Sequence, residues 1–188
     1  MNRPFGLRSL LVLAAACAAG PALAHVTAQP SEGATGGTFR TAFNVPHGCD
    51  GSATVAVRLK IPEGVTGVKP QLKPGWQITL KMRKVQPPME AGKPVDAGHI
   101  QMDQHGTMAS ETVDEITWRG GPLPDNFYDT FPVAMTLPDT AAGTTLYFPV
   151  VQECQKGVQR WIAIPAAGQN WDDLREPAPY VRVKPKSP

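Results

Sequence analysis

The chain has 188 residues, including 20 Pro and 18 Gly, with 18 Lys or Arg, 16 Asp or Glu and a formal net charge of +2. The prolines argue against a helical bundle, because each proline inside a helix removes a backbone hydrogen bond. Scattered basic residues leave no patch for nucleic acid, and the sequence lacks the nucleotide-binding motifs GxxxxGKS and GxGxxG and the hydrolase motif GxSxG.

The first 24 residues read as a secretory signal peptide. Arg3 and Arg8 precede the short apolar run 10–19, and the residues 22–24 (ALA) fit the small-x-small cleavage rule. We predict cleavage after Ala24 and export to the periplasm, which leaves one domain, 25–188, with equal numbers of basic and acidic residues. The alternative is lipidation at Cys17, which follows a poor lipoprotein box and would leave His25 inside the chain.

Beyond the leader, short alternating segments separated by Pro, Gly, Asn and Asp turns predict about nine strands. This spacing suggests a single domain with an all-β fold, either an immunoglobulin-like β-sandwich or a Greek-key barrel. The polar, His- and Met-bearing stretch 86–111 is expected to form a long loop or hairpin, and 169–176 one helical turn. The expected strands are 26–29, 38–45, 53–61, 76–85, 112–118, 131–137, 145–152, 158–164 and 180–183.

Cleavage after Ala24 would make His25 the first residue of the exported chain. An N-terminal histidine offers its α-amine and its Nδ1 to one metal ion in a six-membered chelate ring, and nitrogen-rich tetragonal sites favour Cu(II). The alternative is that cleavage exposes a histidine by chance.

Strand pairing predicts the neighbours of His25. If 26–29 and 38–45 pair through the turn 30–37, His25 lies near His47. The pair Cys49 and Cys154 is expected to form a disulfide in an oxidising compartment, with a thiolate metal site as the alternative. A bridge would bring the end of the strand 145–152 to the same place, with Trp161 opposite Gln152. The residues expected to converge are His25, His47, Asp50, Glu153 and Trp161.

Other residues offer further metal ligands. His99, Met102, His105 and Met108 recur every three residues, and imidazole with thioether suits Cu(I) at a second site, although an ordinary surface loop would look the same. The sequence does not choose a carboxylate for the first site, for which the candidates are Glu111, Glu115, Asp129 and Glu153.

Several blocks together resemble the YcnI-like copper-binding domain family. They are HVTAQP, VRLKIPEGV followed by VKPQLKPGW, ITWRGGPLPDNFYDTF, and LYFPVVQECQKGVQRWIAIP; PHGCDG and FPVVQEC resemble its proteobacterial branch, which carries the cysteine pair. The resemblance implies a cupredoxin-like sandwich, export, and Cu(II) held by a single N-terminal histidine brace beside a tryptophan. The brace would fall on His25 and the tryptophan on Trp161. Family members often carry an acidic residue where this chain has Thr130, next to Asp129.

We therefore expect a periplasmic copper-binding protein for copper storage, trafficking or homeostasis, without enzymatic activity. Its cofactor would be Cu(II), with Cu(I) at the second site, and its partners would be copper chaperones or membrane copper transporters. The sequence predicts no particular oligomeric state. The rival hypotheses are a copper-dependent oxidative enzyme, for which His47 would be the second histidine, and a structural or adhesion sandwich that binds no metal.

Overall fold

Mostly antiparallel strands build the protein, and strands such as β3 and β10 alternate buried and less buried residues. The computed structural model describes residues 25–85, 89–90, 93–94 and 111–186. Within these ranges, no helix is both long and apolar enough to cross a membrane. The strands are β1 (Thr27–Gln29), β2 (Glu32–Ala34), β3 (Thr38–Val45), β4 (Thr54–Lys60), β5 (Thr66–Pro70), β6 (Trp76–Lys84), β7 (Met89–Glu90), β8 (Lys93–Pro94), β9 (Glu111–Leu123), β10 (Asp129–Thr136), β11 (Thr145–Tyr147), β12 (Val150–Cys154), β13 (Val158–Trp161) and β14 (Tyr180–Lys184).

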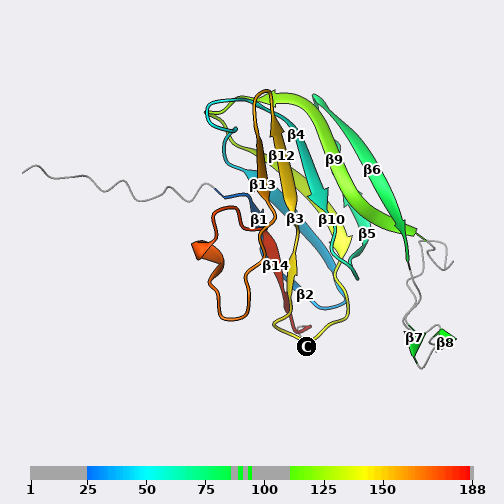
Figure 1. Ribbon diagram of the computed structural model, residues 1–188. Helices are drawn as coiled ribbons and strands as arrows, with labels where there is room; N and C mark the ends of the chain where they lie inside the picture. The colour runs from blue at the N-terminus through cyan, green and yellow to red at the C-terminus, as the bar shows by residue number, and fades with distance from the viewer. Residues whose placement is uncertain (1–24, 86–88, 91–92, 95–110, 187–188) are drawn as a thin grey trace, which may run out of the picture.

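Two sheets form the sandwich, as the sequence predicts (Figure 1). One has the strand order β1-β3-β10-β5 and the other β13-β12-β4-β9-β6. A smaller sheet, β11-β14-β2, contains the parallel pair of β14 with β2, and β7 pairs with β8.

Aromatic side chains from both main sheets fill the core. Phe43, Trp118, Phe131 and Phe148 are fully buried, and the rings of Trp118 and Phe131 meet edge to face with centroids 5.3 Å apart. Burial of a large apolar side chain stabilises a fold by roughly 1.5–3 kcal/mol, so these four residues contribute substantially to the packing of the core.

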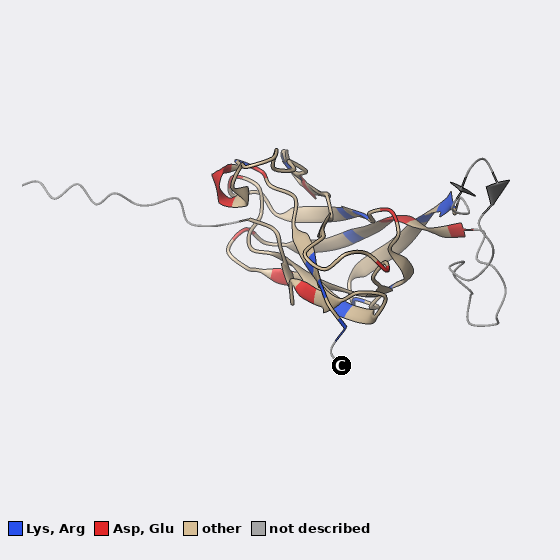
Figure 2. Cartoon of the chain, turned by 90° about the horizontal axis from the view of Figure 1, so that it is seen from below, with Lys and Arg blue, Asp and Glu red and all other residues tan. Residues whose placement is uncertain are grey.

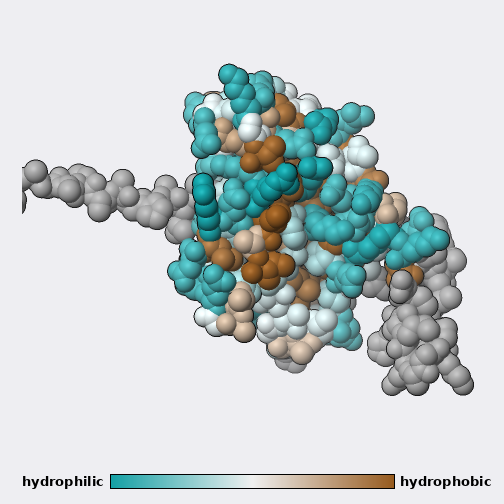
Figure 3. Space-filling model, in the orientation of Figure 1, coloured by the Kyte–Doolittle hydropathy of each residue, from teal (hydrophilic) through white to brown (hydrophobic). Residues whose placement is uncertain are grey.

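Charged and apolar residues share the surface. In Figure 2 the blue basic segments lie on several separate strands, with red acidic segments among them. Brown apolar atoms also reach the face shown in Figure 3. The exposed apolar side chains Val158, Ile162 and Ile164 lie on β13 and the segment after it.

Candidate metal centre

His25 lies where β1 approaches the end of β3. These strands pair antiparallel with Thr27 opposite Asn44, so the same register carries His25 to the residues that follow β3, where His47 lies. The predicted pairing of the first two expected strands is therefore confirmed. The turn between them, 30–37, contains an additional short strand, β2, which pairs in parallel with β14.

Two tryptophans flank the imidazole of His25. Its ring centroid lies 5.7 Å from that of Trp161 and 5.3 Å from that of Trp171, with interplanar angles of 63° and 88°. Both contacts are edge-to-face, the geometry that aromatic quadrupoles favour. Because the two tryptophans come from separate segments of the chain, they fix the ring on two sides.

The ring nitrogen Nδ1 of His25 is buried and has no hydrogen-bond partner within the part of the chain that the structure describes. Burying a polar atom without a partner costs free energy, so such atoms are rare in folded proteins and call for an explanation. Nδ1 is also the atom that forms a chelate ring with the α-amine of an N-terminal histidine.

The side chain of Trp161 is held by Gln152. The indole Nε1 donates a hydrogen bond of 3.0 Å to Oε1 of Gln152. In the β12–β13 register, however, Trp161 pairs with Val150, and Gln152 pairs with Gln159. The expected position of Trp161 opposite Gln152 is therefore wrong by two residues. Both side chains still face the same way, because side chains on one face of a strand repeat every two residues.

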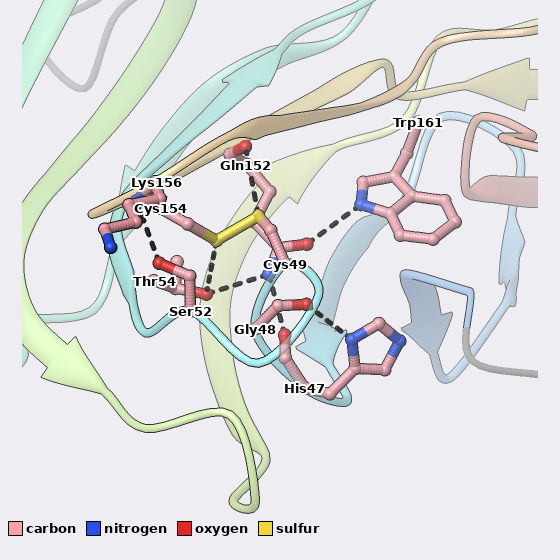
Figure 4. Close-up of a disulfide and its surroundings, with 9 residues drawn as sticks. All are labelled: His47, Gly48, Cys49, Ser52, Thr54, Gln152, Cys154, Lys156 and Trp161. Carbon is pink, nitrogen blue, oxygen red and sulfur yellow. Dashed lines mark hydrogen bonds between the residues drawn. A yellow bond between two sulfur atoms is a disulfide. The ribbon is translucent and has the colours of Figure 1, made fainter.

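His47 lies in the β3–β4 loop, beside the disulfide. Cys49 and Cys154 are bridged with an S–S distance of 2.07 Å, which confirms the predicted pairing and leaves no thiolate for a metal. Nδ1 of His47 hydrogen-bonds the carbonyl oxygen of Gly48, and the carbonyl oxygen of His47 accepts a bond of 2.7 Å from Nε2 of Gln152. Figure 4 shows the His47 and Trp161 rings on the same side of the disulfide.

Glu153 does not join this group. Gln152 and Cys154 point into the core, so Glu153 between them points to the outer face of the sheet. There its two carboxylate oxygens pair with Arg58 and Arg119, each at 3.0 Å. The sequence analysis ended the expected strand at Gln152, whereas β12 continues to Cys154 and turns Glu153 away from the core.

Asp129 lies at the end of the sheet near His47 but is already paired. It is opposite Val45 on β10, which lies on the other side of β3 from β1. Its Oδ1 accepts hydrogen bonds from Nζ of Lys73 at 2.6 Å and from the backbone N–H of Thr130 at 2.8 Å. A metal ion at Asp129 would therefore compete with the positive charge of Lys73 for the same carboxylate.

The remaining acidic candidates are spread over the molecule. Asp50 is exposed in the turn after Cys49, with a positive φ of 47°. Glu111 and Glu115 lie on β9, and Glu115 is opposite Lys60 and Lys81. Among the described residues, no three His, Cys, Asp or Glu side chains converge on a common metal position. The predicted second site, His99, Met102, His105 and Met108, lies outside the described residues.

Trp171 is the member of this group that the sequence analysis missed. It begins the short 3-10 helix η2 (Trp171–Asp173), inside the predicted helical turn 169–176. Its Nε1 donates a hydrogen bond of 2.7 Å to the carbonyl oxygen of Ala178, and its ring also contacts Tyr180, with centroids 5.6 Å apart. The signal in the sequence was an aromatic residue within an otherwise polar segment, GQNWDD.

A family model described as a domain of unknown function, DUF1775, matches residues 25–183. The chain belongs to this family. The resemblance to the YcnI-like family is thus confirmed at this level. A crystal structure of an uncharacterized protein from Nocardia farcinica, described as having an immunoglobulin-like fold, is similar with a TM-score of 0.60 and 24% identity over 85% of this chain and 98% of that one. It identifies the fold as an immunoglobulin-like sandwich. The comparison with curated proteins found no match.

Proposed function

We propose that the protein binds copper outside the cytoplasm and stores it or passes it on, and that His25 is its principal ligand. The observation that carries this proposal is the buried, unpartnered Nδ1 of His25 between Trp161 and Trp171. A metal ion at this atom would compensate the cost of burying it. Since the family match begins at His25, the position of this histidine at the start of the domain also fits a ligand that uses its α-amine.

Two nitrogens of one residue would hold the ion. An α-amine has a pKa of about 7.7–8.0, so its deprotonation by a metal costs little at neutral pH. Imidazole and amine nitrogens suit Cu(II), which is highest in the divalent affinity order. The two tryptophans would limit access of water and other ligands to the histidine, an arrangement that favours retention of the metal over turnover of a substrate.

The expected location follows from the disulfide and the leader. A bridge between Cys49 and Cys154 is typical of an oxidising compartment. We propose the periplasm, with copper chaperones or membrane copper transporters as the partners that deliver or receive the ion. In this proposal the residues His99, Met102, His105 and Met108 supply a second site, for Cu(I).

Replacement of His25 by Ala, with the cleavage site preserved, tests this proposal. We expect the wild-type exported protein to bind one equivalent of Cu(II) tightly. His25→Ala should lose nearly all of this binding, because the variant keeps an α-amine at its start but loses the imidazole that closes the chelate ring with it. The measurement is a Cu(II) titration in competition with a chelator of known affinity, accompanied by the electron paramagnetic resonance spectrum of the loaded protein.

The control is the double replacement of His99 and His105 by Ala, which removes the same chemical group twice elsewhere. This variant should still bind one equivalent of Cu(II) with the affinity of the wild type. Tight binding that survives in His25→Ala would overturn the proposal, and an absence of tight binding in the wild type would favour the sandwich without a metal role. If the protein oxidised an added glycan and lost this activity on replacement of His47, the result would favour a copper-dependent oxidative enzyme.

A further inference from the structure

Gln152 is a fully buried polar side chain beside the candidate metal centre. Its amide makes three hydrogen bonds. Oε1 accepts from Nε1 of Trp161 at 3.0 Å, while Nε2 donates to the carbonyl oxygen of His47 at 2.7 Å and to Oγ1 of Thr54 at 2.8 Å (Figure 4). Each hydrogen of the amide group and one lone pair of its oxygen are thus used.

The orientation of this amide follows from the chemistry of its neighbours. An indole N–H can only donate, and a backbone carbonyl can only accept. Oε1 must therefore face Trp161, and Nε2 must face His47. Rotation of the amide by 180° would break both bonds, so Gln152 can connect these two groups in one way only.

Gln152 thereby joins its neighbouring strand β13 to the β3–β4 region, which is distant in sequence. Trp161 belongs to β13, His47 to the β3–β4 loop, and Thr54 to β4, whose Oγ1 lies 3.7 Å from the disulfide sulfur of Cys154. Trp161 in turn contacts the imidazole of His25. A change in the direction of the Gln152 amide would therefore affect the indole of Trp161, which contacts His25, and the backbone of the loop that carries His47.

We propose that Gln152 is a positioning residue for the metal centre. Gln152 holds the indole of Trp161 against His25, and it fastens the loop that carries His47 to β12. It does not contact the metal itself. This inference rests on the proposed copper function. Residues that orient a metal site from behind its ligands commonly change metal affinity by roughly 10–100-fold when they are replaced.

The test is Gln152→Met, which keeps the length of the side chain and removes all three hydrogen bonds. We expect the indole N–H of Trp161 to shift in the ¹H–¹⁵N spectrum and to exchange faster with solvent. Cu(II) affinity should fall by roughly tenfold or more, and the copper hyperfine splitting should change in the electron paramagnetic resonance spectrum. A purely structural role would lower stability without altering that spectrum.

Thr54→Val is the matched control. It removes one bond to the same Nε2 but preserves those to Trp161 and His47. We expect lower stability, with affinity and spectrum close to the wild type. The inference is overturned if Gln152→Met binds copper as the wild type does, or if Thr54→Val changes the spectrum equally.

A second variant covers the case in which Gln152→Met does not fold. Gln152→Glu keeps an oxygen for the Trp161 N–H and loses the donor to His47. It should bind Cu(II) more weakly than the wild type, with an altered spectrum, and unchanged binding would contradict the inference. If the wild-type protein itself binds no Cu(II) tightly, the proposed function fails and this inference fails with it.

Discussion

At the scale of single residues, Asp114 is a buried acidic residue that is surrounded by three basic side chains. It lies on β9 with only 8% of its side chain exposed, and its carboxylate pairs with Lys60, with Lys81 at 3.4 Å and with Arg83 at 3.4 Å. The hydrogen bond from Lys60 is the largest of the effects that lower the pKa of Asp114 below its ordinary value, and it outweighs the opposing effect of burial. The charged form is therefore the one that the fold stabilises.

This ion cluster makes stability depend on pH. A carboxyl group whose pKa is lower in the folded protein stabilises the fold above its ordinary pKa of 3.8, and this contribution disappears as the pH falls through the lowered value. Asp114→Asn should reduce the free energy of unfolding at pH 7 by about 1–2 kcal/mol, because the hydrogen bonds to charged partners weaken. The difference from the wild type should shrink below pH 4.

Urea unfolding at pH 7, 4 and 2.5 measures this effect. Glu32→Gln is the control, because Glu32 pairs with Arg182 and Lys184 at an exposed position, where ion pairs contribute little. If the difference in free energy of unfolding between Asp114→Asn and the wild type stayed constant below pH 4, the proposed role of the Asp114 carboxylate would be wrong.

At the scale of elements, the disulfide joins the β3–β4 loop to the end of β12. The bridged cysteines are separated by 105 residues in sequence. In the chain-entropy model, closing a loop of this length stabilises a protein by roughly 4–5 kcal/mol. Replacing both Cys49 and Cys154 by Ala should therefore lower the free energy of unfolding by about this amount.

Urea unfolding with and without a reductant measures the contribution of the bridge. The reductant should destabilise the wild type and leave the double Ala variant unchanged. Equal sensitivity of both proteins would show that the reductant acts elsewhere. Oxidised wild type and the double variant with the same stability would contradict the expected stabilisation.

The elements show what sequence patterns can and cannot predict. Regular alternation located β3 at the predicted bounds, because each of its positions follows the two-residue period. The expected strand 145–152 is instead two strands, β11 and β12, which belong to different sheets and are separated by Phe148 and Pro149. The short strands β2 and β5 were missed, since their pairing depends on partners distant in sequence.

The same distinction applies to the candidate centre. Strand order and the cysteine pair brought His25, His47 and Trp161 to one end of the sandwich. The outward direction of Glu153, the ion pair of Asp129 with Lys73 and the contact of Trp171 with His25 depend on register and loop packing. A single sequence does not encode these features in a readable pattern.

At the scale of the whole molecule, His25 lies at the start of the domain, yet its ring packs against Trp161 and Trp171 from distant parts of the chain. The ring is thus fixed by tertiary contacts, while the availability of its α-amine depends on processing. In a chain that retains residues before His25, that nitrogen is an amide and cannot serve as the basic amine. In the proposed function, cleavage after Ala24 would therefore complete the metal site at the moment of export.

Two purified chains can separate the contributions of fold and processing. One begins at His25 and the other retains four leader residues, beginning at Pro21. Both preserve the sandwich and the imidazole, so their stabilities without copper should agree. The longer chain should bind Cu(II) at least roughly a hundredfold more weakly, because joining two donors in one chelate strengthens binding by about 10²–10⁴-fold.

Intact mass verifies each start and the loss of two hydrogens to the disulfide, and chelator competition gives the affinities. Equal affinities would show that the imidazole binds without the amine, and the brace would then have to be abandoned even if His25 remained a ligand.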